Sequence, residues 1–123
     1  MSYLIESTRN TPTINFNAEN GSLEISGRSM PENTRKFYDP IIAWLHNFKP
    51  DPSLEISLTI NLSYLNTSST IAMLEVLKTI AKLKENGNTV KVLWHYDQYD
   101  EDMKMAGEDI SSISELDFEY VEE

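Results

Sequence analysis

Leu54-Glu55-Ile56-Ser57-Leu58-Thr59-Ile60-Asn61-Leu62 is the stretch that decides the fold of this 123-residue chain. Apolar and polar residues alternate through it, and this period of two is typical of a strand with one face on the core. The cluster Asn66-Thr67-Ser68-Ser69-Thr70 follows, and its residue types are those preferred at a helix N-cap. From about Ser68 to Asn86, apolar residues recur at helical spacing up to the stop signal Asn86-Gly87-Asn88. A strand followed by an amphipathic helix is therefore the centre of the predicted fold.

The C-terminal third of the chain repeats this alternation of strand and helix. Thr89 to Tyr96 is apolar enough to form a central strand, and Glu101 to about Ser112 reads as a shorter, acidic helix. Leu116 to Val121 is a final strand. Because strands that alternate with helices need crossover connections, the pattern predicts a largely parallel sheet.

The N-terminal part predicts a hairpin. Residues up to about Thr11-Pro12 have no regular period and read as a loose lead-in. Thr13 to Asn17 and Ser22 to Ser26 each alternate apolar and polar residues. Asn20-Gly21 between them is a strong signal for a tight turn, so the two segments are expected to pair as a β-hairpin.

A first helix is predicted between the hairpin and the long strand. Ser29-Met30-Pro31-Glu32 has the spacing of a capping box, with proline in the first turn. Pro40 should kink this helix or mark a later start, and Lys49-Pro50-Asp51-Pro52 ends it. An apolar stripe at spacings of three and four follows the capping box: Phe37, Ile41, Trp44, Leu45 and Phe48.

These elements predict one α/β domain over residues 1–123. Its order is β-β-α-β-α-β-α-β, and its sheet is mixed but mostly parallel, with the hairpin as the antiparallel portion. A chain of this length fits one domain and can bury a sizeable core without disulfides, which the absence of cysteine excludes.

The composition excludes several classes of partner. Ten basic and twenty acidic residues give a net charge of −10, which repels phosphate backbones and anionic lipid. We therefore expect no nucleic-acid partner and no membrane partner, and no apolar run approaches the length of a membrane helix. The N-terminus carries no secretory signal, so a cytoplasmic location is expected. The acidity favours either solubility alone or a basic protein partner, and composition does not separate the two.

The sequence offers few of the groups that nucleophilic catalysis requires. A hydroxyl of the cluster could act as a nucleophile only with a nearby base, and His46 and His95 are the two histidines available. His95 lies near the C-terminal end of a predicted strand, where α/β sheets place their sites. The glycines of a nucleophile elbow are missing. The alternative function is a small hydrolase or a metal-binding protein that uses His95 and Asp97 near the hydroxyl turn.

A metal or nucleotide cofactor is not expected either. Asp97, Asp100, Glu101 and Asp102 crowd together, and clustered carboxylates can hold Mg²⁺ or Ca²⁺. They lack the calcium-loop pattern, and acidic residues at the start of a helix also stabilise its dipole. Four glycines in the whole chain build neither a P-loop nor a dinucleotide fingerprint.

The hydroxyl cluster has more hydroxyls than a helix cap needs. One or two would be enough, and Thr67-Ser68-Ser69-Thr70 supplies four in a row. A phosphate on one of them would add nearly two negative charges. At a helix N-terminus that charge could be accommodated without unfolding, while the surface would change sharply. The cluster therefore suggests a switch that acts on a partner surface.

These residues also carry a family resemblance. A strand, a hydroxyl turn and an amphipathic helix on a small acidic α/β domain resemble the STAS-type anti-anti-sigma factors. The sequence more closely resembles the SiaC family of bacterial regulatory phosphoproteins, whose signature is similar to Leu62-Ser63-Tyr64-Leu65-Asn66-Thr67-Ser68-Ser69. The likeness covers nearly the whole chain. It extends to Pro31-Glu32-Asn33 with Phe37, Tyr38 and Trp44, to Trp94-His95-Tyr96-Asp97, and to Asp100-Glu101-Asp102-Met103 through Gly107-Glu108-Asp109.

The resemblance implies a STAS-like regulatory protein without catalytic activity or cofactor. It implies a Ser/Thr protein kinase and an opposing PP2C-type phosphatase as partners. It also implies an effector bound by the unphosphorylated form, which in the resembled family is a diguanylate cyclase that controls aggregation and biofilm. Carried over by position, the phosphoacceptor is Thr67, with Ser68 and Ser69 as alternatives of the same chemistry.

The expected partner surface surrounds this turn. Adjacent parallel strands end at one edge of the sheet, so the strand end after the second helix should lie beside the hydroxyl turn. The residues expected to contact partners are Tyr64, Asn66, Ser68, Glu75, Lys78, Tyr96 and Asp97.

Overall fold

The computed structural model describes residues 2–123; Met1, the first residue of the predicted domain, lies outside the described residues. The described residues form one sheet of six strands, with three helices packed against it. The strands are β1 (Ser2–Ile5), β2 (Thr13–Asn17), β3 (Ser22–Ser29), β4 (Ile56–Leu65), β5 (Val90–Tyr96) and β6 (Phe118–Glu122). The helices are α1 (Thr34–Asn47), α2 (Thr67–Glu85) and α3 (Glu101–Ser114).

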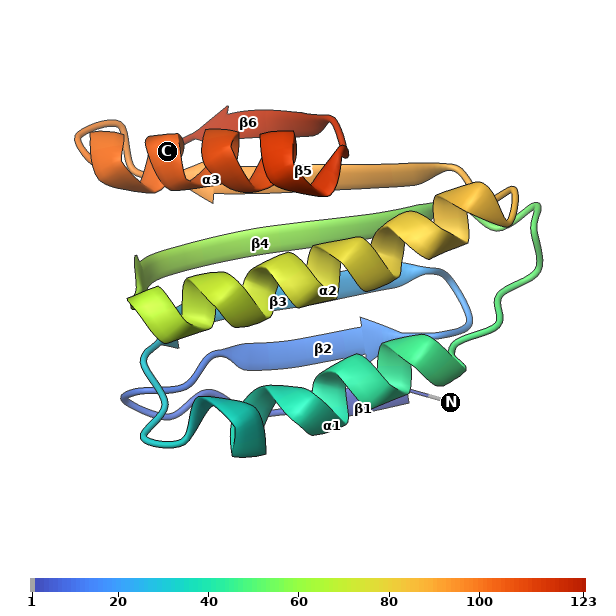
Figure 1. Ribbon diagram of the computed structural model, residues 1–123, viewed down its shortest axis with the longest axis horizontal. Helices are drawn as coiled ribbons and strands as arrows, with labels where there is room; N and C mark the ends of the chain where they lie inside the picture. Colours follow the sequence, from blue (N-terminus) through green and yellow to red (C-terminus); the bar gives the residue numbers. More distant parts are fainter. Residues whose placement is uncertain (1) are drawn as a thin grey trace.

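The six strands lie in the sheet in the same order as in the sequence. β1, β2 and β3 form an antiparallel meander, and β3, β4, β5 and β6 are parallel neighbours. Each parallel step crosses over through one helix, and Figure 1 shows all three helices on the same face of the sheet. This follows when each crossover has the same hand and adds its strand on the same side. The predicted mixed, mostly parallel α/β fold is confirmed.

Strand β4 shows why only one face of the sheet is covered. Ile56, Leu58, Ile60 and Leu62 are buried beneath the helices, whereas Ser57, Thr59 and Asn61 between them are only half-buried. The alternation in the sequence therefore separates a core face from a polar face. The strand continues to Leu65, three residues beyond the predicted end.

The N-terminal segment differs from the prediction. Residues 2–5 form strand β1, which pairs with β2 from Ser2 opposite Asn17 to Ile5 opposite Ile14. The Tyr3 ring packs against Trp44 of α1, with 6.2 Å between ring centres. The prediction of a loose lead-in to about Pro12 is wrong over these four residues, because contacts with β2 and α1 decide their structure. The predicted order therefore lacked its first strand.

The start of helix α1 also differs. Asn33 is its N-cap, and the Asn33 side chain accepts a hydrogen bond from the backbone N–H of Lys36 at 3.1 Å. The capping box predicted at Ser29 is wrong, because Ser29 is the last residue of β3 and its side chain is buried. Pro40 lies inside the helix and does not mark its start.

Helix α2 begins and ends within one residue of the prediction. The Asn66 side chain caps it by accepting from the backbone N–H of Ser69 at 2.9 Å. Gly87 follows the last turn with a φ of 108°, a left-handed conformation that favours glycine. Because local capping chemistry sets both ends, this helix could be read from the sequence.

Trp94 of β5 fixes helix α3 on the sheet. The Trp94 side chain is fully buried, and its indole N–H donates to the carbonyl oxygen of Met103 at 2.9 Å. Gly107 of α3 lies directly over the indole, where an added Cβ would come within 2.5 Å of the Trp94 Nε1 atom. The small residue therefore allows the close approach of helix and ring.

Replacing Gly107 with alanine tests this packing. Alanine favours a helix by about 1 kcal/mol over glycine, but the clash with the buried ring should outweigh that gain. We expect Gly107→Ala to lower the free energy of unfolding by about 2 kcal/mol, measured by urea denaturation with tryptophan fluorescence. The control Glu108→Ala, at an exposed neighbouring position, should change it by less than about 0.5 kcal/mol. A Gly107→Ala variant as stable as the wild type would contradict this account of the packing.

Candidate functional site

The hydroxyl turn joins the end of β4 to the start of α2 and is held at both sides. The backbone N–H of Asn66 donates to the carbonyl oxygen of Ser29, at the end of β3, at 3.1 Å. Its side chain caps α2 through Ser69, as described above. In this region β3 and β4 shift register at a bulge between Gly27 and Arg28, after which Arg28 pairs with Tyr64. The turn is therefore a fixed part of the sheet edge.

Two of the four hydroxyls of the turn are committed to the fold. Ser69 is fully buried, and its oxygen accepts a hydrogen bond from the Ser29 hydroxyl at 2.8 Å. The Thr70 hydroxyl donates to the backbone carbonyl of Asn66 at 3.1 Å. Neither hydroxyl is presented to a partner in this structure.

The other two hydroxyls lie at the surface. Ser68 is exposed, and its oxygen lies 2.7 Å from the Thr34 hydroxyl oxygen at the start of α1. Thr67 is also exposed, and within residues 2–123 no hydrogen bond engages its hydroxyl. Accessibility and hydrogen bonding therefore distinguish four neighbours that look equivalent in the sequence.

A buried group of three hydroxyls lies beneath the turn. The Ser29 oxygen lies 2.5 Å from the Tyr38 hydroxyl oxygen and also donates to Ser69. All three side chains are fully buried, and burial raises the pKa of the Tyr38 hydroxyl above its ordinary value. The group connects β3, α1 and α2, so it holds the start of α2 against the start of α1.

A second connection between α1 and α2 lies at the surface. The Arg35 guanidinium donates to the Glu75 carboxylate at 2.7 Å and also pairs with Asp39. Hydrogen bonds with Glu75 and Asp39 raise the pKa of the Arg35 guanidinium above its ordinary value. Glu75, one of the residues expected to contact partners, is therefore already in an ion pair.

Two shallow hollows flank the turn. One of about 390 Å³ lies toward α1 and is lined by Glu32, Asn33, Thr34, Arg35, Ser68 and Ile71. The other, of about 280 Å³, lies toward α3 and is lined by residues that include Tyr64, Thr70, Asp100 and Asp102. Tyr64 and Ile71 are 45% and 56% exposed, so each hollow has an exposed apolar side chain at its border.

The expected partner residues do not form one hydrogen-bonded group within residues 2–123. Tyr64, Asn66 and Ser68 belong to the turn, and Lys78 is exposed farther along α2. Tyr96 instead faces the C-terminal elements, with its hydroxyl 3.5 Å from the Glu122 carboxylate and Lys104 over its ring. The Asp97 carboxylate accepts from the backbone N–H of Tyr99 at 2.9 Å. Across residues 2–123, no hydrogen bond connects Tyr96 or Asp97 with residues 64–70.

The two histidines lie apart from the hydroxyl turn. His95 pairs in the sheet with Asn61 and Val121, on the face that the helices leave uncovered. Its Nδ1 atom lies 3.7 Å from the Glu123 carboxylate, and in the described part of the chain no hydroxyl hydrogen-bonds to it. His46 lies in the last turn of α1, whereas the hydroxyl turn adjoins its first turn. Neither histidine is positioned as a base for a hydroxyl of the turn.

The acidic run after Tyr96 has a structural role in the fold. The Asp100 carboxylate caps α3 by accepting from the backbone N–H of Met103 at 3.0 Å.

Over residues 2–123, no three side chains of His, Asp or Glu converge to hold a metal ion. In the same residues, no helix has the length and apolar character needed to cross a membrane.

Several residues of the site have no local signal in the sequence. Ser29 looks like a helix cap, and Tyr38 looks like an ordinary core residue. The Ser29–Ser69 and Arg35–Glu75 contacts each join residues 40 positions apart. Only the pairing of the strands and the packing of the helices bring these side chains together.

Three comparisons with known proteins bear on the function. Residues 5–123 match a family described as "SiaC family regulatory phosphoprotein". A protein of Pseudomonas aeruginosa strain UCBPP-PA14 is 35% identical over 97 residues, which cover 79% of this chain and 77% of that protein.

Solved structures are similar over almost the whole chain. The crystal structure of apo-SiaC from Pseudomonas aeruginosa matches with a TM-score of 0.85 and 28% identity, covering 100% of this chain and 98% of that one. The crystal structure of the diguanylate cyclase SiaD in complex with its activator SiaC, from the same organism, matches with a TM-score of 0.88 and 30% identity. That match covers 98% of this chain and 99% of the other.

The buried hydroxyl group gives a prediction about stability. Tyr38→Phe and Ser69→Ala each remove one member and should lower the free energy of unfolding by about 1 kcal/mol at pH 8. Because the raised pKa keeps Tyr38 protonated in the folded state, its contribution is present below the ordinary tyrosine pKa of about 10 and is lost as the pH rises above it. The advantage of the wild type over Tyr38→Phe should therefore shrink between pH 8 and pH 10.5 in urea denaturation.

Tyr64→Phe is the matched control, because it removes the hydroxyl of a half-exposed tyrosine at the same end of the sheet. It should change the free energy of unfolding by less than about 0.5 kcal/mol. Equal effects of Tyr38→Phe and Tyr64→Phe would show that the buried group does not stabilise the fold.

Proposed function

The chain belongs to the SiaC family of regulatory phosphoproteins, and on that basis we propose that residues 1–123 act as one partner-switching regulatory domain. In this proposal the unphosphorylated form binds and activates an effector protein. Phosphorylation of Thr67 ends the binding. The protein is a regulator of other proteins and not an enzyme.

The state of the Thr67 hydroxyl is the observation that carries the proposal. It is exposed, and no hydrogen bond within residues 2–123 engages it, so a kinase can reach it without breaking the fold. Thr67 is also the first residue of α2, and negative charge is favourable at a helix N-terminus. A phosphate there would change the surface while the helix remained folded. Modification of the buried Ser69 would instead require the start of α2 to open.

The identity of the effector is proposed from the relatives. SiaC of Pseudomonas aeruginosa is an activator found in complex with the diguanylate cyclase SiaD. This chain has 30% identity with that structure over nearly its full length, so we propose a diguanylate cyclase as its effector. The family description as a regulatory phosphoprotein supports phosphorylation as the control. We propose a Ser/Thr kinase and an opposing PP2C-type phosphatase as the other partners. Because the kinase needs ATP, we place the switch in the cytoplasm.

The contact surface in this proposal is centred on the turn. Tyr64, Asn66 and Ser68 surround Thr67 and are its principal residues. Glu75 and Lys78 would extend the surface along α2, and Tyr96 and Asp97 would lie at its margin. Since the phosphate would stand inside this surface, it would block binding directly, and no change of fold is required.

The phosphorylation site can be mapped directly. With ATP and the Ser/Thr kinase from the same organism, we expect one phosphate on wild-type protein and none on Thr67→Ala, as measured by intact-mass and peptide mass spectrometry. Ser68→Ala and Thr70→Ala are the controls and should accept phosphate as the wild type does. If Thr67→Ala still accepts a phosphate and that phosphate maps to Ser68, the phosphoacceptor is Ser68 and not Thr67.

Binding and activation of the cyclase give a separate prediction. Wild type and Thr67→Ser should bind the cyclase and raise its synthesis of cyclic-di-GMP. Phosphorylated wild type should bind at least tenfold more weakly, a loss of about 1.4 kcal/mol in calorimetric titration. Thr67→Ala should resist the kinase and bind in its presence. If phosphorylated and unphosphorylated proteins bind equally, the turn does not control the contact.

A further inference from the structure

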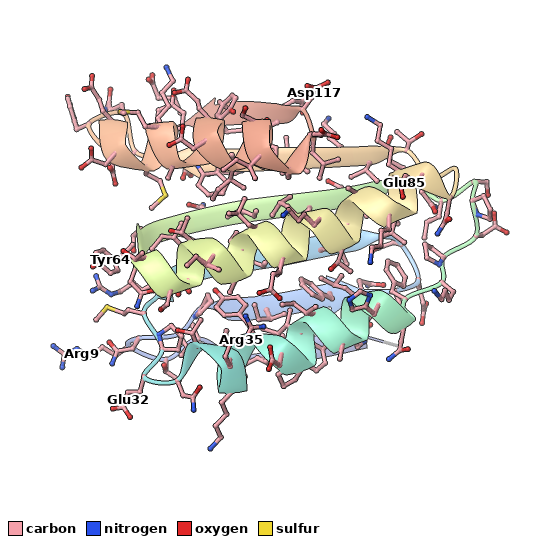
Figure 2. All side chains as sticks on the ribbon, viewed as in Figure 1. Arg9, Glu32, Arg35, Tyr64, Glu85 and Asp117 are labelled. Atoms are coloured by element: carbon pink, nitrogen blue, oxygen red, sulfur yellow. The ribbon has the colours of Figure 1, made fainter. Side chains whose placement is uncertain are left out.

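The arginines of this acidic protein have an uneven distribution. The chain has a net charge of −10 and contains three arginines, Arg9, Arg28 and Arg35. Figure 2 shows Arg9 and Arg35 at the same end of the sheet as Tyr64, whereas Glu85 lies toward the other end. Arg28 pairs with Tyr64 across β3 and β4, so it belongs to the same end. All three arginines therefore lie at the end that carries the Thr67 turn.

Backbone hydrogen bonds hold Arg9 and Arg28 beside the turn. The carbonyl oxygen of Asn10, next to Arg9, accepts from the N–H of Met30 at 2.8 Å. Ser29, next to Arg28, accepts from Asn66 at 3.1 Å, as described above. The Arg28 guanidinium also lies over the Tyr64 ring, 5.4 Å from its centre. These contacts place the backbone of Arg9 and of Arg28 near the turn.

Arg9 and Arg28 differ from Arg35 in their bonding. Arg35 is neutralised by Glu75 and Asp39. Within residues 2–123, no carboxylate forms a salt bridge with Arg9 or Arg28, although the chain has twenty acidic residues. Arg28 donates only to the Met30 sulfur, a weak acceptor, at 3.3 Å. Both arginines are exposed, so their guanidinium groups are available for carboxylates outside this chain.

The surroundings of Thr67 have opposite charges on two sides. Arg9 and Arg28 lie on the side of β1 to β3, while Asp100 and Asp102 line the hollow toward α3. Glu32 lies at the hollow toward α1, beside Arg35. Tyr64 lies between the two sides and is 45% exposed. Tyrosine and arginine, together with tryptophan, are enriched among the side chains that dominate protein interfaces.

We propose that an acidic segment of the effector docks on Arg9 and Arg28, with Tyr64 as the apolar anchor beside them; this inference rests on the proposed function. This docking explains why phosphorylation of Thr67 would end the binding. A phosphate on Thr67 would bring about two negative charges to the positive part of the surface. It would offset the two arginines and repel the acidic segment.

A pair of variants with equal charge tests this proposal. Arg9→Gln/Arg28→Gln removes both arginines, and Lys82→Gln/Lys84→Gln removes two exposed lysines near the far end of α2. Each variant is titrated with the diguanylate cyclase from the same organism at 50 mM and 300 mM NaCl. The arginine variant should bind at least tenfold more weakly than wild type at low salt, with a smaller loss at high salt. The lysine variant should stay within about twofold of wild type, because its charges lie far from the contact.

The outcomes separate this inference from the proposed function. If wild type binds and both double variants bind alike, the acidic docking segment is wrong and the proposed function stands. If unphosphorylated wild type does not bind the cyclase, the proposed function and this inference both fail. Far-UV circular dichroism checks folding, and Arg9→Gln alone, with Lys82→Gln as its control, provides the same comparison if the double variant does not fold.

Discussion

The buried hydroxyl group formed by Ser29, Tyr38 and Ser69 is the interaction that fixes the end of the sheet where Thr67 lies. It joins the last residue of β3, the first helix and the first turn of α2 at one point inside the core. A buried hydroxyl without a partner is costly, so the three residues constrain one another. The position of Thr67 follows from this constraint, since it lies two residues before Ser69 on the same helical turn. The buried hydroxyls of Ser29, Tyr38 and Ser69 thus determine where the exposed hydroxyl of Thr67 lies.

The arrangement of the sheet explains why functional residues gather at this end. The parallel strands β3, β4 and β5 all end at the same edge of the sheet. A helix follows each of them in the chain, directly or after a short loop. Strand ends and helix N-termini therefore share one edge, as in other α/β sheets. The loop between β1 and β2 reaches the same edge through its hydrogen bond with Met30. The ends of three strands and the loop between β1 and β2 therefore lie at the same edge of the sheet.

Charge and hydrogen bonding work together in the proposed switch. Within residues 2–123, the unphosphorylated turn has a Thr67 hydroxyl without a hydrogen bond, an exposed Tyr64, and Arg9 and Arg28 without a salt bridge. All of these are compatible with a tight protein contact. In this proposal a phosphate on Thr67 would change the electrostatics of that surface without requiring a change of fold. A switch of this kind needs no second conformation, because the added charge acts where the partner would bind.

The sequence by itself determined the central strand, the helix after it and the turn between them. The alternation from Leu54 to Leu62 and the capping chemistry of Asn66 are local patterns. They can be recognised without knowing which distant residues are in contact. The family resemblance pointed to Thr67, and the net charge of −10 predicts that the protein has no nucleic-acid partner. Only the tertiary structure showed that β1 is a strand, that Ser29 is a buried core residue, and that Thr67 and Ser69 differ in accessibility. It also decided that three arginines spread over 27 positions meet at one edge. These features depend on contacts between distant residues, which no local period records.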